Sequence, residues 1–112
     1  MNSPKVSEIS RQELQSKLTS HAPLVLLEAL PAAYYERGHL PGARNLPLDQ
    51  VRALADAVAP EKSAEIVVYC ASPTCPNSHI AAGVLAGLGY PNVRVFSGGK
   101  QEWQEAGLAL EA

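Results

Sequence analysis

The sequence predicts an α/β domain with a mostly parallel sheet of five strands and helices on both faces. Short apolar runs rich in β-branched residues alternate with stretches of helical apolar spacing, five times along the chain. Proline, glycine and asparagine separate these segments. Strands that alternate with helices form parallel sheets covered on both faces. At 112 residues the chain is long enough for its own core, so we expect one domain over residues 1–112.

The first strand and helix are expected near the amino terminus. Residues 6–9 are suited to a short strand. Ser10 and Glu13 have the spacing of a capping box, which predicts a helix that runs to about Leu18.

Two further strands follow in the first half of the chain. Residues 24–27 are apolar and predict a buried strand with Glu28 at its end. Pro31 begins a short helix that Gly38 ends. Residues 43–46 lie between prolines, which favours a short edge strand.

The second half repeats the alternation. Asp49 is expected to cap a helix that continues to about Val58. Residues 66–69 are a β-branched run typical of a strand buried on both faces, and Cys70 follows it directly. A fifth strand is expected over residues 93–96, before a last helix that carries Trp103.

The segment after Cys70 is expected to be a loop and then a helix. Pro73, Pro76 and Asn77 break regular structure, and Ser78 begins a run with helical spacing. The apolar residues of that run are Ile80, Val84, Leu85 and Leu88. The cysteine therefore lies at the carboxyl end of a buried strand and ahead of a helix, where ligands collect in open α/β sheets.

Composition excludes several classes of function. The net charge is −2 and no basic cluster is present, which argues against nucleic acid or an anionic membrane as partner. No apolar run approaches the roughly 18 residues that span a bilayer. Residues 1–5 lead into no apolar signal segment, so we expect a cytoplasmic protein with reduced thiols. Two cysteines do not make a disulfide scaffold.

Three motifs in order resemble the rhodanese family. They are the stretch from Gly38 to Pro47 (GHLPGARNLP), the strand that leads into Cys70, and a carboxyl end with Gly89-Tyr90, Gly98-Gly99 and Trp103. The resemblance covers about residues 6–110. It implies the rhodanese α/β fold with a central five-stranded parallel sheet, and a persulfide carried on Cys70.

The sequence departs from the family pattern in two places. The family usually has Asp-x-Arg after its second strand, whereas this chain has Glu28-Ala29-Leu30 and so lacks the cation. Six residues separate Cys70 from Asn77, which stands where the family's loop arginine is expected, and residues 70–79 contain no lysine or arginine. Thiosulfate is a dianion that benefits from a guanidinium, so we expect it to be a poor donor.

The chemistry of Cys70 follows from its surroundings. A thiolate is the nucleophile, and the amino terminus of a helix stabilises an anion placed before it. Loop amides can add hydrogen bonds to a thiolate or persulfide. The active-site loop comprises Ala71, Ser72, Pro73, Thr74, Cys75, Pro76, Asn77 and Ser78. The alternative is that Cys70 is a small buried apolar residue at the end of a strand.

Three roles are open for Cys75. It can be a resolving thiol that attacks the Cys70 persulfide and releases sulfide, because the loop can bring the two Cα atoms within the roughly 4.4–6.8 Å of a disulfide. It can be an ordinary loop residue. A metal site with Cys70 and His79 fits no common zinc spacing, so we expect no metal. His79, in the first turn of a helix, is expected to be neutral.

Other residues are expected to shape the site without reacting. His39 is expected to fix its turn through a ring hydrogen bond. Glu28 is expected to accept hydrogen bonds from backbone or from Arg44. Gly98 and Gly99 are expected to allow close backbone approach near the site or to make a tight turn.

The leading function is sulfur transfer without a cofactor. Cys70 would take sulfane sulfur from a small donor and pass it to a thiol, cyanide or a protein acceptor. A second hypothesis is a non-catalytic binding or redox-sensing module that uses Cys70 and Cys75. A third, an arsenate- or phosphate-processing enzyme, is disfavoured because the loop lacks the charge that phosphoryl transfer needs.

Overall fold

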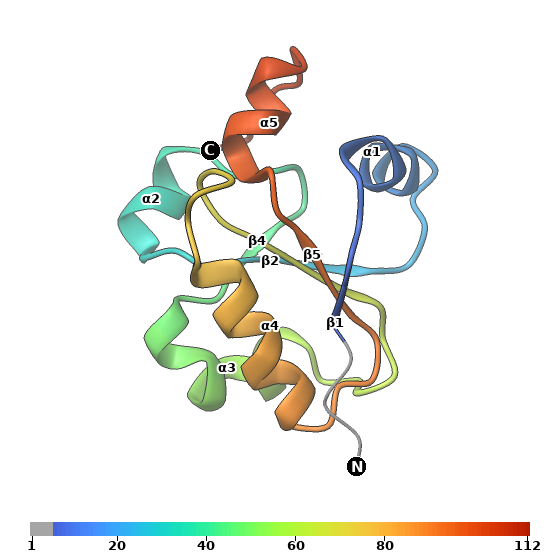
Figure 1. The fold of residues 1–112 in the computed structure, drawn as a ribbon, viewed down its shortest axis with the longest axis vertical. Helices are drawn as coiled ribbons and strands as arrows, with labels where there is room; N and C mark the ends of the chain where they lie inside the picture. The colour runs from blue at the N-terminus through green and yellow to red at the C-terminus, as the bar shows by residue number, and fades with distance from the viewer. Residues whose placement is uncertain (1–5) are drawn as a thin grey trace.

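The computed structural model describes residues 6–112 and contains one five-stranded sheet. The expectation about a signal segment falls on residues 1–5, outside the described residues. The strand order is β1-β5-β4-β2-β3, and every neighbouring pair is parallel. The strands are β1 (Val6–Glu8), β2 (Val25–Glu28), β3 (Arg44–Asn45), β4 (Ile66–Tyr69) and β5 (Val93–Phe96). The predicted fold class is confirmed, with β4 at the centre of the sheet (Figure 1).

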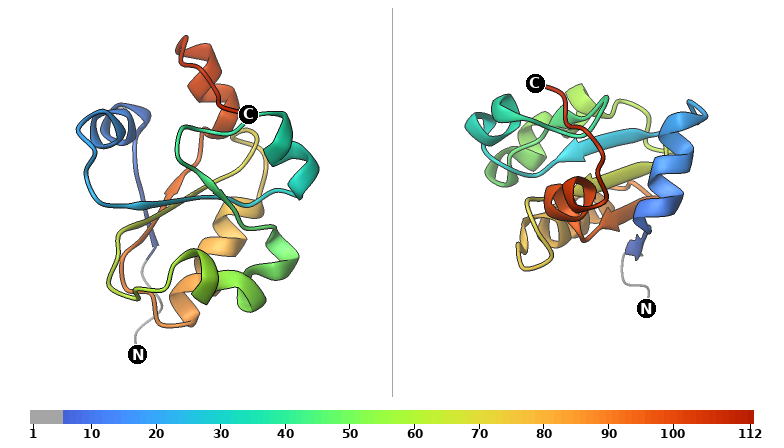
Figure 2. Two further views of the ribbon diagram at one scale, coloured as in Figure 1. Left: turned by 180° about the vertical axis from the view of Figure 1, so that it is seen from behind. Right: turned by 90° about the horizontal axis from the view of Figure 1, so that it is seen from above.

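Helices connect the strands and cover both faces of the sheet. They are α1 (Arg11–Thr19), α2 (Ala32–Arg37), α3 (Val51–Val58), α4 (Asn77–Gly87) and α5 (Gly99–Glu105), with a 3₁₀ turn η1 (Leu48–Gln50) before α3. The right view of Figure 2 shows the sheet between α3 and α4 on one side and α1 on the other. None of the helices described for residues 6–112 has the length and apolar character needed to cross a membrane.

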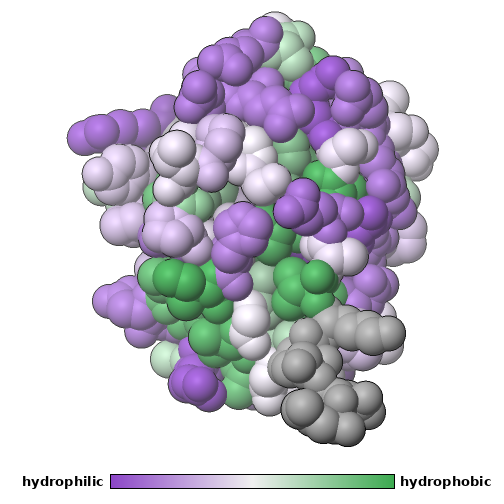
Figure 3. Space-filling view, in the orientation of Figure 1, coloured by the Kyte–Doolittle hydropathy of each residue, from purple (hydrophilic) through white to green (hydrophobic). Residues whose placement is uncertain are grey.

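One core lies between the sheet and helices α3 and α4. Alternate strand residues face it, and Ala81, Ala82 and Leu85 of α4 are fully buried against them. Small alanines let α4 approach the sheet closely. Ile80 belongs to the predicted apolar pattern of this helix, yet it is 50% exposed. It turns away from the sheet, and Figure 3 shows hydrophobic surface over this part of the molecule.

The opposite core lies beneath α1 and α5. Phe96 packs edge-on against Trp103, whose indole N–H donates to the Ala109 carbonyl at 3.0 Å. Trp103 is 3% exposed, so it covers the core on this face of the sheet. Leu14 of α1 and Leu26 of β2 also belong to this core.

Two predicted helix caps have different outcomes. The Ser10 hydroxyl accepts the Glu13 N–H at 3.0 Å, so Ser10 caps α1 as predicted. The Glu13 carboxylate binds Arg94 at 2.7 Å instead of reaching back to the cap. The prediction that Asp49 caps α3 is wrong, because Asp49 lies inside η1 and Gln50 precedes the helix without a side-chain cap. The 3₁₀ turn continues directly into α3, which leaves no place for a separate cap.

Candidate active site

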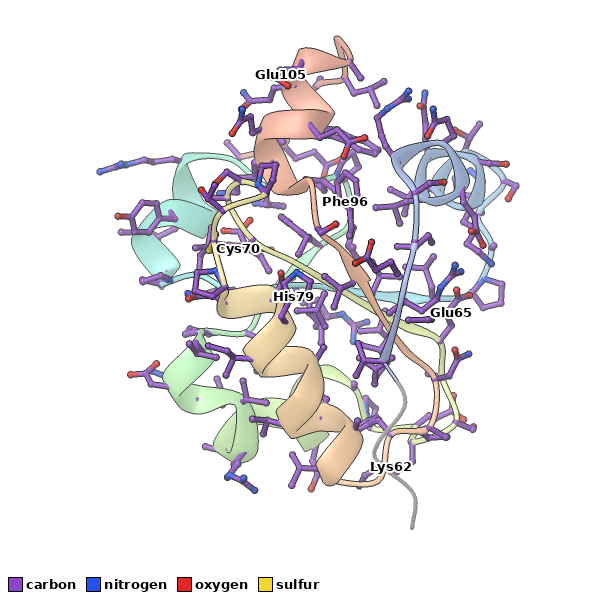
Figure 4. All side chains as sticks on the ribbon, viewed as in Figure 1. Lys62, Glu65, Cys70, His79, Phe96 and Glu105 are labelled. Carbon is purple, nitrogen blue, oxygen red and sulfur yellow. A yellow bond between two sulfur atoms is a disulfide. The ribbon has the colours of Figure 1, made fainter. Side chains whose placement is uncertain are left out.

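Cys70 lies at the carboxyl end of β4, between the ends of β2 and β5. Its side chain is only 1% exposed. Figure 4 shows Cys70 where the chain leaves the sheet, and His79 lies on α4 just beyond the loop. The strand, loop and helix order predicted around Cys70 is therefore the order found.

The loop after Cys70 folds back and joins its two cysteines. Cys70 and Cys75 form a disulfide, with their Cα atoms 6.2 Å apart. The turn is closed by the Cys75 N–H, which donates to the Ser72 carbonyl at 3.1 Å, and by a 3.1 Å hydrogen bond between the hydroxyls of Ser72 and Thr74. The loop thus brings Cys75 into bonding distance of Cys70 without any regular structure between them.

The start of α5 holds the other side of the strand end. The backbone N–H of Lys100 donates to the Cys70 carbonyl at 3.0 Å, and the N–H of Gln101 donates to the Ala71 carbonyl at 2.9 Å. Gly99 has φ +63°, and a Cβ there would collide with the Cys70 carbonyl. The expected close backbone approach is found at Gly99. At Gly98 a Cβ would collide with the Glu102 side chain rather than with backbone at the strand end.

A buried polar cluster, formed by Glu28, Tyr69 and Lys100, lies directly behind Cys70. The Glu28 carboxylate is fully buried and accepts a hydrogen bond from the Tyr69 hydroxyl at 2.7 Å. Its second oxygen, Oε2, lies 3.0 Å from the Lys100 ammonium. Lys100 Nζ also donates to the Tyr34 carbonyl, and the Tyr69 hydroxyl accepts the Leu40 N–H, each at 3.0 Å. We call the three residues the Glu28 cluster.

The Glu28 cluster corrects one prediction about the site. Glu28 does not bind Arg44, whose guanidinium donates to the Val58 carbonyl. Arg44, on the edge strand β3, thus reaches the end of α3, whereas Glu28 lies against Lys100 of α5. Burial and the hydrogen bond to Glu28 raise the pKa of the Tyr69 hydroxyl well above its ordinary value. Tyr69 therefore stays protonated and donates to the carboxylate.

His39 has the structural contact expected of it. Its Nδ1 lies 3.0 Å from the Tyr35 carbonyl, and its ring stacks on the Tyr35 ring with centroids 3.9 Å apart. The Tyr35 hydroxyl donates to the Ala43 carbonyl at 2.6 Å. These contacts fix the turn that contains His39.

Asn77 does not replace the missing loop cation. Its side-chain amide donates to the Ala29 carbonyl at 3.0 Å, which ties the start of α4 to the end of β2. Ser78 is buried and His79 is exposed. Within residues 6–112 no group of histidine, cysteine and carboxylate side chains is arranged to hold a metal ion.

Lys100 is the site residue that the sequence reasoning missed. It supplies a cation to Glu28 from α5, seventy-two positions along the chain, where the family pattern has an arginine two residues after the acid. The signal available was the loss of that arginine at Leu30 together with a lysine directly after Gly98-Gly99. A buried carboxylate without its usual partner calls for another cation.

Residues 10–106 match the rhodanese-like domain family. The chain belongs to this family. The match contains the strand end with Cys70, the loop and the start of α5.

Individual relatives carry different functions in their names. The chain is 32% identical to the adenylyltransferase and sulfurtransferase of Candida albicans, covering 87% of this chain and 23% of that protein. It is 31% identical to an HTH-type transcriptional regulator of Mycobacterium tuberculosis, and the match covers 92% of this chain and 44% of the regulator. A thiosulfate sulfurtransferase structure from Pseudomonas aeruginosa superposes with a TM-score of 0.84 at 27% identity, covering 95% of this chain and 20% of that one. The chain thus spans less than half the length of each.

Proposed function

We propose that this domain is a sulfurtransferase in which Cys70 carries sulfane sulfur as a persulfide. The observation that carries the proposal is the place of Cys70, at the end of the central strand β4 and ahead of the amino terminus of α4. A thiolate there gains from the partial positive charge of the helix terminus. Family membership and the sulfurtransferases among the relatives support the same chemistry. Residues 1–112 act in this proposal as one domain.

The reaction needs the reduced form of the loop and proceeds in two transfers. The Cys70 thiolate attacks the sulfane sulfur of the donor, and the donor's leaving group departs with the electron pair of the broken bond. The thiolate of an acceptor, a small thiol or a protein, then attacks the outer sulfur and expels the Cys70 thiolate. Cyanide attacks the outer sulfur in the same way and leaves as thiocyanate. No cofactor takes part in either step.

Cys75 has a defined place in this scheme as a resolving thiol. Its thiolate attacks the inner sulfur of the Cys70 persulfide, which forms the Cys70–Cys75 disulfide and releases hydrosulfide. The Cys70–Cys75 disulfide in the structure is the bond that this step would form, which supports the role. The acceptor and Cys75 therefore compete for the same persulfide.

Intact-mass analysis tests the proposal. Reduced protein treated with a sulfane donor should gain about 32 Da, one sulfur atom, until Cys75 resolves the persulfide, and Cys70→Ser should gain nothing. In Cys75→Ser the added sulfur should persist, because the resolving thiol is gone, and sulfide release should stop. Sulfur that still adds to Cys70→Ser would assign the carrier role to Cys75. Equal sulfide release by Cys75→Ser and the parent would make Cys75 a bystander.

The donor is expected to be something other than thiosulfate. Residues 70–79 contain no lysine or arginine, the Asn77 amide donates to the Ala29 carbonyl, and the Lys100 ammonium pairs with Glu28. A missing charge-assisted hydrogen bond costs about 1.5–3 kcal/mol, or roughly ten- to a hundredfold in apparent affinity. Asn77→Arg should therefore tighten thiosulfate saturation, with Asn77→Gln as the uncharged control. Tight saturation by the parent would contradict this expectation.

A redox-sensing module is the second candidate. The Cys70–Cys75 disulfide and the relative that is a transcriptional regulator favour it. In this case the dithiol and disulfide forms of residues 70–75 present different surfaces to a partner. Limited proteolysis would then differ between the two forms in the parent and not in Cys75→Ser. Turnover with any of several sulfane donors would favour the transferase.

A further inference from the structure

The two residues of the Cys70–Cys75 disulfide differ in their exposure to solvent. Cys70 is 1% exposed, and its carbonyl is held by the Lys100 N–H. Cys75 is partly exposed and lies between Thr74 and Pro76, both of which are exposed. A molecule that arrives from solvent therefore meets Cys75 first.

We infer that Cys75 is the entry site for an external thiol that reduces the disulfide, so that the mixed disulfide forms on Cys75 in large excess over Cys70. This inference rests on the proposed function in one respect: reduction of the disulfide frees Cys70 for sulfur transfer. The reductant is a thiol compound. The second thiol that completes the reduction comes from the same molecule or from another molecule of the reductant.

The chemical step is a thiol–disulfide exchange. The incoming thiolate bonds to Cys75 Sγ, the Cys70–Cys75 bond breaks, and its electron pair leaves on Cys70 as a thiolate. A second thiolate then attacks the sulfur of the reductant in the mixed disulfide. The reductant leaves as a disulfide, and Cys75 leaves as a thiolate that takes a proton from water. The loop gains two electrons and the thiol pair loses them.

Access, rather than the helix field, selects the sulfur. Both cysteines precede α4, so the positive end of that helix stabilises either one as a leaving thiolate. The rate then depends on which sulfur can be reached. Space for the adduct acts in the same direction. A group attached to Cys75 extends from a partly exposed loop, whereas Cys70 lies at a buried strand end.

The reductant has two possible sources, which two arms of one experiment separate. Residues 70–79 carry no lysine, arginine, aspartate or glutamate, so the loop itself neither attracts nor repels a charged thiol. One arm uses glutathione. The other uses a small protein with a Cys-x-x-Cys motif whose second cysteine is changed to serine, which leaves the mixed disulfide unresolved.

The experiment maps the first adduct on the oxidised parent protein under native conditions. The reaction is quenched with N-ethylmaleimide at the earliest times, which alkylates the released cysteine. Trypsin leaves Cys70 and Cys75 on one peptide, because no lysine or arginine lies between Lys62 and Arg94. Fragmentation mass spectrometry must therefore assign the adduct within that peptide. Cys75→Ser, which has no disulfide to open, is the matched control.

The expected result is an adduct on Cys75 and N-ethylmaleimide on Cys70, in at least about tenfold excess over the reverse pattern. If this excess is seen only with the Cys-x-x-Cys protein, or only with glutathione, that compound is identified as the source of the reducing thiol. The reverse pattern, an even mixture, or a disulfide that neither thiol opens below the unfolding transition overturns the inference. Because mapping involves no sulfane sulfur, a failure to persulfidate the reduced protein would instead overturn the proposed function and leave this result standing.

Discussion

The two faces of the sheet are built from the same strands but differ in chemistry. The face under α3 and α4 is lined mainly by aliphatic residues and alanines, and Tyr90 is a buried residue there with a hydroxyl. The face under α1 and α5 buries the Glu28 cluster at its carboxyl edge. Tyr90 donates to the Ala59 carbonyl at 2.7 Å, so its partner is neutral, whereas the partner of Tyr69 is a carboxylate.

The two faces therefore have different roles: one stabilises the fold, and the other positions the start of the Cys70 loop. Apolar burial on the α3 and α4 side is non-directional and holds the fold together. The Glu28 cluster is directional, and it connects β2, β4 and α5 at the point where the Cys70 loop begins. Changes on the two faces should therefore have different effects on unfolding and on the reactivity of Cys70.

The largest effect is expected for Lys100→Met. This change leaves the Glu28 carboxylate buried and unpaired, which costs about 3–5 kcal/mol for a buried pair that loses one partner. Urea unfolding should show the loss, and the rate of Cys70 alkylation in the reduced protein should change with it. The double variant Glu28→Gln with Lys100→Met is the control and should recover most of the stability. A single variant as stable as the parent would show that the pair contributes nothing.

Leu85→Ala tests the apolar face with a comparable loss of stability. Leu85 is fully buried in α4, and removing its side chain should cost about 2–5 kcal/mol through lost burial and a cavity. At temperatures where the variant is folded, the alkylation rate of Cys70 should equal that of the parent. A changed rate would mean that the two faces are coupled.

A matched pair of tyrosine changes should show a smaller difference. Tyr69→Phe leaves Glu28 without one donor and the Leu40 N–H without its acceptor, which should cost about 1–3 kcal/mol. Tyr90→Phe removes hydrogen bonds to backbone carbonyls only and should cost about 0.5–1.5 kcal/mol. Denaturant midpoints of the two variants give the comparison, and the opposite order would contradict it.

The smallest effect is expected at the exposed edge of the α1 face. The Arg94 hydrogen bond lowers the pKa of Glu13 below its ordinary value, with further contributions from the charges of Arg94 and Lys17. A lowered carboxyl pKa adds stability that is complete above the ordinary value and is lost as the pH falls through the lowered one. Glu13→Gln should flatten the acid limb of the stability curve, while Glu61→Gln, at an exposed position, should leave it unchanged. Identical curves would show that this ion pair has no measurable effect.

Local patterns predicted most of the fold because they are read from neighbouring residues. The β-branched run of β4, the Ser10 cap and the breakers after Cys70 each depend on a few adjacent positions. Where the prediction was wrong, a neighbouring element had changed the local outcome. Asp49 does not cap α3, because η1 contains Asp49 and continues into that helix.

The sequence by itself determined the order of the elements, the place of Cys70 at the end of a central strand, and the loop that contains both cysteines. Only the tertiary structure decided the partners of Glu28, because Tyr69 and Lys100 come from elements far along the chain and meet it only when β2, β4 and α5 converge. It also decided that Cys70 is buried while Cys75 stays partly exposed. Spacing fixes which residues can meet, whereas burial and charge pairing depend on what the rest of the chain packs around them.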